Sequence, residues 1–549
     1  MILERISING YLGIRHLTFS VGPVNAIIGE NGWGRSSLFN ILEKVFGDDD
    51  VPCRFSANEF YIDEDTGNFL DHMEFEFVFR ERKYGQLKRS PTLQLFKRYW
   101  IREDDDFNHI HYRITASRRG GKVSVRHFFA DDKGNPLRSH KKIIRKFIYM
   151  NPVFRIRDSR INRDQDSAAN IRYANEWERK VSILAAQLAD SDELIGMDKS
   201  CLHEGLDALN YIVSSYVPEV RDSKPMKYRT AREIASQPIT LRGMGSLKSL
   251  LSGSDSAAMK LIMVLFQDAI MMARGSRTLP RINFPILIMS DLESRLHPSF
   301  LMIFMAILDR ISFQKIFTTN SGDLLSCLAL SDIRRMVRNS HGEVKSYSLN
   351  ENRFSADDLR RLASHVRLTR PVSVFARCWL LVEGETEIWL MLQLASIAGF
   401  NLQAEGIRII EFAQCGANPL IKLAQQLGIN WHLLCDGDDA GVRYVKLAQN
   451  MLLPGQMSRD HITKLNDVDI EHFLYNNGFE SVYRMESGYG FAQNVTANKI
   501  IERAIHRRSK PGLAINIIEK ADRLGPEGIP EKLMNLFKTL VMLCSDNEM

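Results

Sequence analysis

Residues 29–37 read GENGWGRSS, and this stretch decides how the first part of the chain folds. A short apolar run over 25–28 precedes it, and apolar residues at helical spacing follow over 36–45. The order of strand, glycine-rich loop and helix is the setting in which backbone N–H groups and a helix N-terminus surround phosphate oxygens. The pattern therefore predicts an α/β domain that binds a nucleotide.

The loop departs from a standard phosphate-binding loop at one important position. Gly29, Gly34 and Ser36 fit the pattern G-x-x-x-x-G-K-[ST], but Arg35 stands where the lysine belongs. That lysine normally reaches the β- and γ-phosphates, and arginine keeps the charge as a broad fork rather than a point charge. The loop residues that we expect to contact a nucleotide are Asn31, Gly32, Gly34, Arg35, Ser36 and Ser37.

The longer pattern G-x-N-G-x-G-[KR]-S-[ST] resembles the ABC-type ATPase heads of the SMC and RecF kind. That resemblance implies three further motifs, and each is present in altered form. They are LSGS at 251–254, ILIMSDLESRLHP at 286–298 as the Walker B strand, and TTNS at 318–321. By the same resemblance, the further nucleotide contacts would be Ser252, Gly253, Asp291, Glu293 and Asn320.

Four ATPase positions have changed together. Ser290 stands where the resemblance places a metal-binding aspartate, Asp291 where it places the water-orienting glutamate, and Asn320 where it places a histidine. Arg35 is the fourth change. Asp291 and Glu293 remain able to hold Mg²⁺. We therefore expect this domain to bind ATP without hydrolysing it quickly.

A second set of motifs begins after residue 370. The segments LLVEGETEIWL at 380–390 and LLCDGDDAG at 433–441 each place acids directly after an apolar strand. In open α/β sheets that edge is where ligands bind. Glu387 follows Glu383 by four residues, which places both on one face of a helix that has just begun. In DVDIEHFL at 467–474, Asp469 and Glu471 alternate as on an extended segment or loop.

Clustered carboxylates repel one another unless a cation neutralises them, and hard oxygen ligands select Mg²⁺ or Mn²⁺. Two such ions about 4 Å apart can activate a water and stabilise the leaving oxygen of a phosphodiester. A strand-ending glutamate together with a strand-ending D-x-D-D-x-G is therefore typical of phosphodiester chemistry. A single exposed acid would carry no such meaning.

The pattern E-G-x-x-E followed by D-x-D-x-x-G resembles the Toprim fold of topoisomerases, primases and related nucleases. An ABC head joined to a Toprim domain is the architecture of the OLD (overcoming lysogenisation defect) nucleases, which the whole chain resembles. The resemblance implies two metal ions, a lysine near the scissile phosphate, and a role in phage defence or DNA processing. The implied metal ligands are Glu383, Glu387, Asp436, Asp438, Asp469 and Glu471. The implied catalytic residues are Glu383, Asp436, Asp438 and Lys510, the lysine of RRSKPGLA.

The chain of 549 residues is long enough for more than one domain. We expect an α/β fold twice over, with an ATPase-like domain at 1–370 and a Toprim domain at 371–549. Within the first domain, residues of about 158–235 have a helical pattern and would form an insertion through which a homo-oligomer, a dimer or tetramer, assembles. The boundary falls at Arg370-Pro371.

Composition narrows the setting of the protein. The seven cysteines are scattered without a C-x-x-C pair, as in a cytoplasmic protein with reduced thiols and no zinc site. No apolar run reaches the length of a membrane span, and Glu4 and Arg5 interrupt the first apolar stretch, unlike a secretory signal. We expect no membrane partner.

The charge distribution is compatible with a polyanion partner, and the resemblance to OLD nucleases implies that this partner is DNA. The net charge is +6, and basic residues gather in two segments, whose members would neutralise phosphates in a salt-sensitive way. The first segment, 138–163, holds Arg138, Lys141, Lys142, Arg145, Lys146, Arg155, Arg157, Arg160 and Arg163. The second holds Arg503, Arg507, Arg508 and Lys510.

Two other functions stay open at this point. A topoisomerase or primase would also use Toprim motifs, but it needs a positioned tyrosine or a zinc site, and no segment supplies either clearly. A nucleotide-responsive DNA-binding protein without turnover would explain Arg35, Ser290 and Asn320. It would not explain the complete acidic set after residue 370. We therefore favour a metal-dependent endonuclease or nickase.

Overall fold

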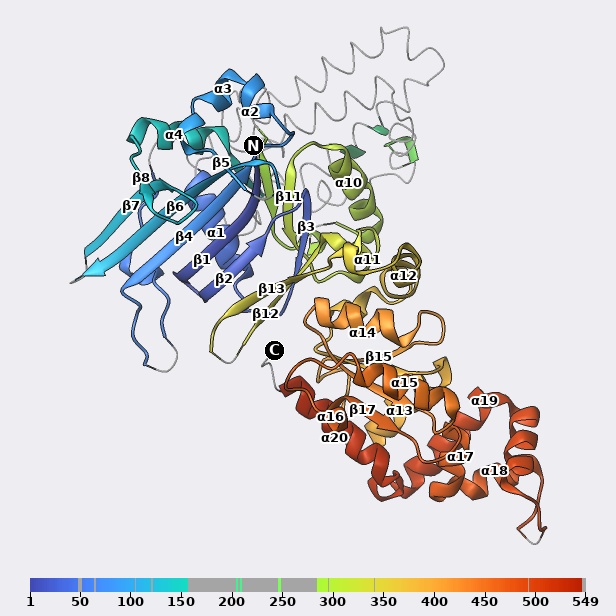
Figure 1. The fold of residues 1–549 in the computed structure, drawn as a ribbon. Coiled ribbons are helices and arrows are strands. Elements are labelled where there is room, and N and C mark those ends of the chain that lie inside the picture. The colour runs from blue at the N-terminus through green and yellow to red at the C-terminus, as the bar shows by residue number, and fades with distance from the viewer. Residues whose placement is uncertain are drawn as a thin grey trace, which may run out of the picture. The chain divides into compact units, whose positions relative to one another are not determined.

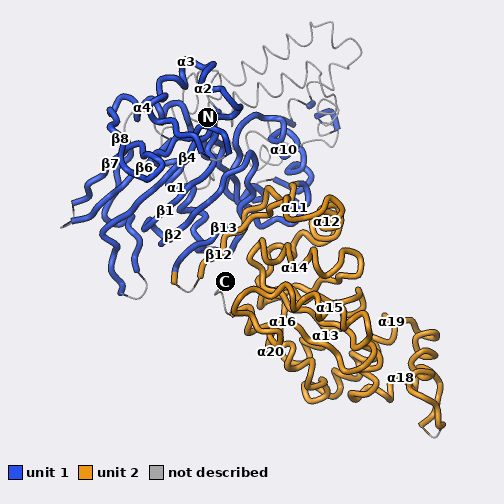
Figure 2. The backbone as a smooth tube through the Cα atoms, viewed as in Figure 1, with its two compact units in different colours: residues 1–327, 342–346 blue, residues 328–341, 347–549 orange. Residues whose placement is uncertain are grey.

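The computed structural model describes residues 1–47, 52–63, 66–103, 105–119, 122–156, 204–205, 208–209, 245–247, 284–294, 296–339, 341–491 and 493–545. The predicted helical insertion lies almost wholly outside these ranges, as do Ser252 and Gly253. The chain forms two compact units, which Figure 2 shows in blue and orange. Unit 1 comprises Met1–Cys327 and Gly342–Ser346, and unit 2 comprises Leu328–His341 and Tyr347–Met549. The division at Arg370-Pro371 stays a prediction.

Unit 1 contains an antiparallel sheet with the strand order β2-β1-β4-β6-β7-β8, and β5 pairs with β6 (Figure 1). Its central strands alternate buried and partly exposed residues, as expected for a sheet with one covered face. Aromatic side chains fill that face, and Phe46 from helix α1 lies edge-on to Phe77. The strands are β1 (Ile2–Tyr11), β2 (Ile14–Ser20), β4 (His72–Arg80), β5 (Ile101–Arg102), β6 (Asn108–Arg119), β7 (Lys122–Ala130) and β8 (Pro136–Leu137).

Unit 1 also contains parallel strands in the order β3-β11-β10-β9. All residues of β10 and β11 are buried; β10 reads as an unbroken apolar run in the sequence, whereas β11 also buries the polar residues Gln314, Lys315 and Thr318. The strands are β3 (Val24–Ile28), β9 (Val153–Ile156), β10 (Ile286–Met289) and β11 (Gln314–Thr318). The described helices of unit 1 are α1 (Arg35–Phe46), α2 (Gln86–Arg89), α3 (Pro91–Gln94), α4 (Lys141–Met150), α10 (Pro298–Arg310) and α11 (Gly322–Ser326).

Unit 2 is built on a parallel sheet with the order β15-β14-β16-β17. These strands are β14 (Cys378–Val382), β15 (Ile407–Glu411), β16 (Asn430–Cys435) and β17 (Ile462–Lys464). Strand β12 (Ile333–Arg338) also belongs to unit 2, and β13 (Val344–Ser348) is divided between the units. The helices are α12 (Ala356–Leu362), α13 (Glu385–Ile397), α14 (Ala417–Gln426), α15 (Asp439–Gln449), α16 (Ser458–His461), α17 (Ile470–Leu474), α18 (Glu480–Ser487), α19 (Ala497–Leu524) and α20 (Glu531–Ser545).

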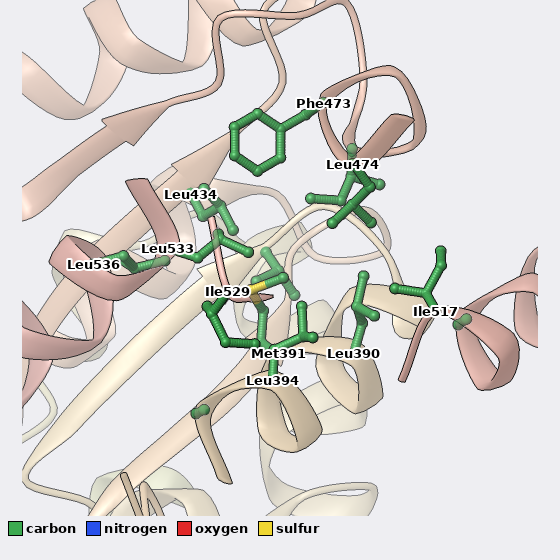
Figure 3. Close-up of a cluster of buried hydrophobic side chains, with 14 of the residues drawn as sticks. Leu390, Met391, Leu394, Leu434, Phe473, Leu474, Ile517, Ile529, Leu533 and Leu536 are labelled. Atoms are coloured by element: carbon green, nitrogen blue, oxygen red, sulfur yellow. The ribbon is translucent and has the colours of Figure 1, made fainter. Parts of the chain in front are cut away.

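One apolar core holds the sheet and helices of unit 2 together, and Figure 3 shows part of it. Leu390, Met391 and Leu394 from α13 meet Leu533 and Leu536 from α20 in this cluster. Each fully buried leucine stabilises the fold by about 2 kcal/mol through the hydrophobic effect. The core therefore fixes α13 and the strand ends beside it, which is what a site at the sheet edge requires.

The structure confirms the expected order of strand, glycine-rich loop and helix, since the loop at 29–34 joins β3 to α1. Six cysteines are described, and all six are free thiols; Cys201 lies outside the described residues. Within the described residues, the structure contains no helix whose length and apolar character would let it cross a membrane.

Candidate active site

The glycine loop of unit 1 folds as a phosphate loop does. Gly34 adopts a φ of 87° as the N-cap of α1, a left-handed conformation that glycine reaches without the steric cost of a side chain. The N-terminus of α1 therefore opens onto the loop without a side-chain cap. Ser36 is exposed at this end, whereas Ser37 is buried. These features fit the expected binding of an anion.

The guanidinium of Arg35 is already bonded within this loop region. Its Nη2 donates to Asn31 Oδ1 at 3.0 Å, and its Nη1 donates to Asn320 Oδ1 at 3.2 Å. The structure thus brings together three residues that the sequence assigned to one nucleotide site from motifs far apart in the chain. Asn320 takes part through its side-chain oxygen, which a histidine could not offer in the same way.

The two acids that follow β10 are also engaged. Asp291 Oδ1 accepts from the hydroxyl of Thr318 at 3.0 Å, and Asp291 has a φ of 46°, which is unusual outside glycine. Glu293 accepts from the hydroxyl of Thr319 at 2.8 Å and from the backbone N–H of Asn320 at 2.7 Å. Each of these acids therefore already accepts hydrogen bonds from the end of β11.

In unit 2 the predicted acids gather at the carboxyl edge of the parallel sheet. Glu383 directly follows β14 and lies before α13, so it does not share a helix face with Glu387, as the spacing had indicated. Gly384 is the N-cap between them, and a side chain there would meet the carboxylate of Glu387 at 2.8 Å. Asp436 directly follows β16, the neighbour of β14. The two strand ends bring both motifs to one edge.

Two of the acids cap helices at this edge. Asp438 is the N-cap of α15 and accepts from the backbone N–H of Gly441 at 2.6 Å. A Cβ at Gly441 would lie 2.0 Å from the backbone oxygen of Asp436, so the glycine of D-x-D-D-x-G allows a close approach of two backbone segments. The cap fixes the direction of the loop that carries Asp436.

The prediction that Asp469 and Glu471 lie on an extended segment is wrong. Asp469 is the N-cap of α17, where it accepts from the backbone N–H of His472 at 2.8 Å, and Glu471 lies in that helix. The reason is that an aspartate three residues before a free backbone N–H satisfies one of the unpaired donors of a new helix. His472, which the sequence reasoning missed, also places its Nδ1 2.6 Å from Asp469 Oδ1 and its Nε2 3.1 Å from Asn498.

Lys510 reaches this acidic edge from α19. Its Nζ lies 2.8 Å from Glu471 Oε1, and its side chain is 52% exposed whereas that of Glu471 is 9% exposed. Ser509 interrupts the helix with a φ of 65°, and Pro511 follows Lys510. Proline lacks the N–H for the helical ladder and disfavours a helical residue before it, so the interruption falls where the sequence places this proline.

Burial and the repulsion between neighbouring acids raise the pKa values of Asp436, Glu383 and Glu387. Burial and the charges of Glu383, Glu387, Asp469 and Glu471 raise the pKa of Asp436 to about 7. The pKa of Glu383 is raised by burial and by Asp438, and Lys510 only partly offsets this. Glu383 Oε2 is buried and finds no hydrogen-bond partner among the described residues. An orphaned carboxylate oxygen inside an acidic cluster fits a site for a cation.

The pKa values of Glu387 and Lys510 complete the charge pattern. Burial, followed by the charge of Glu471, raises the pKa of Glu387. Partial burial acts to lower the pKa of Lys510, but the hydrogen bond to Glu471 and the charges of Glu387 and Asp469 outweigh it and raise that pKa. Lys510 therefore stays protonated, and its positive charge partly offsets the rise in the pKa values of Glu383 and Glu387.

The acids share the edge without forming a tight ligand set. Over the described residues, the group whose ligand atoms all lie within 4.8 Å of one another is Glu4, Asp105 and His109, in unit 1. There Arg80 Nε lies 3.1 Å from Glu4, so the guanidinium group already supplies a positive charge next to this acid. No three carboxylates of the described part of unit 2 bring their ligand atoms within that distance of one another.

Comparison with known proteins finds a different family model for each of two parts of the chain. Residues 1–373 match the family model "Protein of unknown function (DUF2813)". Residues 374–438 match the model "Overcoming lysogenization defect protein-like, TOPRIM domain". Glu383, Glu387, Asp436 and Asp438 fall inside the second match. The chain is 33% identical over 553 residues to the uncharacterized protein YbjD of Escherichia coli (strain K12). The alignment covers 99% of both chains.

Solved structures give more distant likenesses. The C-terminal region of the Burkholderia pseudomallei OLD protein has 21% identity and a TM-score of 0.25, over 31% of this chain and 98% of that one. An Smc head bound to the C-winged helix domain of ScpA has 11% identity and a TM-score of 0.33, over 64% of this chain and 99% of that one.

The two family models match the chain in the same order as the two parallel sheets. The phosphate loop lies on the first of these sheets, and the acidic edge lies on the second. The similarity to YbjD extends over 99% of both chains. The chain therefore belongs to the DUF2813 family together with YbjD, and an OLD-like Toprim domain follows the DUF2813 region.

Proposed function

We propose that this protein is a metal-dependent DNA endonuclease or nickase whose active site is the acidic edge of unit 2. The observation that carries the proposal is the electrostatic state of Asp436. Burial and four neighbouring carboxylates raise its pKa to about 7, and Glu383 Oε2 is buried with no hydrogen-bond partner in the described part of the chain. A protein keeps so costly an arrangement where it binds a cation or does chemistry. The OLD-like Toprim match supports a nuclease.

Six carboxylates would hold two divalent ions, Mg²⁺ or Mn²⁺. The ions would supply an activated water and neutralise charge on the phosphodiester. The role of the chain is to hold the oxygen ligands, and the two helix caps serve this by fixing Asp438 and Asp469. The six residues are Glu383, Glu387, Asp436, Asp438, Asp469 and Glu471.

Lys510 would stabilise charge on the phosphate during cleavage. It is protonated, half-exposed and 2.8 Å from Glu471, so its ammonium group can donate to a phosphate oxygen that enters beside the acids. Such a donor lowers the barrier only if it is placed before the reaction. Its hydrogen bond to Glu471 provides that placement.

Unit 1 would bind ATP as a switch and would assemble the protein into a homo-oligomer. ATP hydrolysis by unit 1 would be slow, because the acids that could hold Mg²⁺ already accept hydrogen bonds from Thr318, Thr319 and Asn320. Phosphate release at rates ordinary for ABC-type ATPases would contradict this part of the proposal. A role in phage defence or DNA processing rests on the likeness to OLD proteins alone.

Plasmid cleavage tests the nuclease directly. Purified protein is incubated with supercoiled plasmid and Mg²⁺ or Mn²⁺, first without nucleotide and then with ATP, for the wild type and Glu383→Ala. Asp439→Asn serves as a control, since Asp439 is an exposed acid next to the cluster in α15. We expect metal-dependent cutting that Glu383→Ala abolishes and Asp439→Asn retains.

A DNA-binding protein without turnover is the second candidate, and the bonded state of Arg35 and Asn320 favours it. Intact DNA binding with no cutting under any metal or nucleotide condition would establish that alternative. Cutting that survives Glu383→Ala would place the nuclease elsewhere in the chain.

A further inference from the structure

The basic segment near residue 505 forms a cationic stripe on one face of α19. Lys499, Arg503 and Arg507 are exposed at helical spacing, with Glu502 and His506 exposed among them, while Ile500, Ile501 and Ala504 are buried on the opposite face. From Lys499 to Arg508, the last residue before the interruption, the helix rises about 14 Å. That length matches roughly four nucleotides of one DNA strand.

Both ends of this stripe are bonded to the helix that carries two of the acids. At one end Asn498 lies 3.1 Å from His472 Nε2, and at the other Lys510 lies 2.8 Å from Glu471. The stripe therefore runs beside the candidate active site, and a strand bound along it would lie next to the metal ligands. Figure 2 shows α18 and α19 together at one end of unit 2.

Helix α18 and the loop that follows it add exposed apolar side chains to this charge. Phe491 is 70% exposed and Met485 is 69% exposed. The guanidinium of Arg484 lies 5.3 Å from the centre of the Phe491 ring, and that of Arg503 lies 4.5 Å from the centre of the Tyr489 ring. Single exposed apolar residues are ordinary, but an aromatic ring set among arginines at the end of a basic stripe is the composition of a nucleic-acid surface.

We propose that this surface, defined as Arg484, Met485, Tyr489, Phe491 and the stripe on α19, binds DNA with unpaired bases. The stripe would contact the phosphates, and the Phe491 ring would stack on an exposed base. In a continuous duplex each base is covered by its neighbours, so a ring of this kind gains little unless a base is unpaired or unstacked. The inference rests on the proposed nuclease function and names its substrate class: single strands, or duplexes with an unpaired stretch.

Binding measured apart from cleavage tests the inference. Fluorescence anisotropy is recorded in Ca²⁺ with three labelled oligonucleotides: a single strand, a fully paired duplex, and a duplex with an unpaired stretch. The variants are Phe491→Ala and Lys499→Ala. Their matched controls are Met542→Ala and Lys538→Ala, exposed residues of α20. Thermal melting followed by circular dichroism checks that every variant is folded.

We expect the wild type to prefer the two probes with unpaired bases. Phe491→Ala should weaken binding to those probes by about tenfold and change duplex binding little, because stacking needs an open base. Lys499→Ala should weaken binding to all three probes and reduce the salt dependence by about one charge. Both controls should bind as the wild type does.

Three outcomes would overturn the inference: equal affinity for paired and unpaired probes, an unchanged Phe491→Ala variant, or no binding of any oligonucleotide. Tight binding through Phe491 without cleavage in Mg²⁺ or Mn²⁺ would refute the nuclease and keep this surface. Cleavage at the wild-type rate by both Phe491→Ala and Lys499→Ala would support the nuclease and refute the DNA-binding surface.

Discussion

Each unit places polar side chains at the carboxyl edge of a parallel sheet, but the two edges balance their charges differently. At the edge of unit 1, Arg35 is bonded to Asn31 and Asn320, and Glu293 accepts from Thr319 and from the backbone. At the edge of unit 2, carboxylates face carboxylates, and the pKa of Asp436 rises to about 7.

This difference separates a site satisfied by its own side chains from one that needs a cation. Polar groups that are bonded to one another lose little when no ligand is present. Uncompensated acids destabilise the fold until a cation arrives, so their retention indicates that binding matters more than stability. Catalysis is therefore expected at the edge of unit 2.

The largest expected effect is on Asp436, and it has two opposite parts. In Mg²⁺ or Mn²⁺, Asp436→Asn should lower plasmid cleavage on the order of 10³-fold, because a metal ligand is lost. In EDTA at pH 8 the same change should raise the free energy of unfolding by about 2 kcal/mol after screening by solvent, because a buried charge and its repulsion by neighbouring acids are removed.

The sign of the stability change depends on pH. Between about pH 4 and pH 7, folded Asp436 keeps a proton that the unfolded chain has lost, so its ionisation destabilises the fold increasingly as the pH rises. The gain from Asp436→Asn should therefore vanish near pH 4 and be complete above pH 7. Urea unfolding across this range measures it. A variant less stable than the wild type at pH 8 would break the comparison between the edges.

Lys510→Ala should lower the rate of cleavage about 100-fold, because one placed donor to the phosphate is lost. Its effect on stability should stay under about 1 kcal/mol, since a half-exposed ion pair contributes little. Cleavage kinetics and thermal melting measure the two quantities. Lys510→Arg should restore part of the rate; equal rates for all three proteins would remove Lys510 from the mechanism.

Glu76 in unit 1 gives the converse case of a compensated acid. Burial alone would raise its pKa, but hydrogen bonds from His111 and Arg113 together with their charges lower it to about 2. Glu76→Gln should therefore cost about 1–2 kcal/mol at neutral pH after solvent screening. The cost should shrink as the pH falls from about 4.5 toward 2, where wild-type Glu76 becomes protonated. A cost independent of pH would show that packing, rather than charge, holds this residue.

The smallest expected effect is on Arg35. Arg35→Lys gives up the bonds to Asn31 and Asn320 but restores the usual phosphate-loop cation. We expect ATP affinity to change by less than about tenfold, and cleavage without nucleotide to stay at the wild-type rate. Calorimetry with ATP and plasmid cleavage check these. Loss of nucleotide-free cleavage would show that the edge of unit 1 also takes part in the chemistry.

Local patterns were sufficient for much of this molecule. Strands such as 286–289 and 378–382 are buried on both faces and read as apolar runs, and Gly34 marks the left-handed turn into α1. The acids that directly follow strands, Glu383 and Asp436, could be placed at one edge because parallel strands end together. The sequence predicted that Arg35 and Asn320 belong to one nucleotide site, but it did not predict the hydrogen bond between them.

The segment around Asp469 shows what local reasoning lacked. Alternating acids indicated an extended segment, but Asp469 caps a helix of five residues, and that helix is held by packing of Phe473 and Leu474 in the core. Short helices depend on tertiary contacts more than on propensity. His472 was missed for the same reason, since its contact with Asn498 joins residues 26 positions apart.

By itself, the sequence determined the two sheets, the phosphate loop and the identity of the acids, because strand period, glycine placement and charge are local properties of a chain. Only the tertiary structure decided that the edge of unit 1 satisfies its own charges while the edge of unit 2 does not. It also decided that Lys510, Asn498 and the stripe on α19 lie beside α17. These outcomes depend on distances between segments far apart in the chain, and no local pattern encodes such distances.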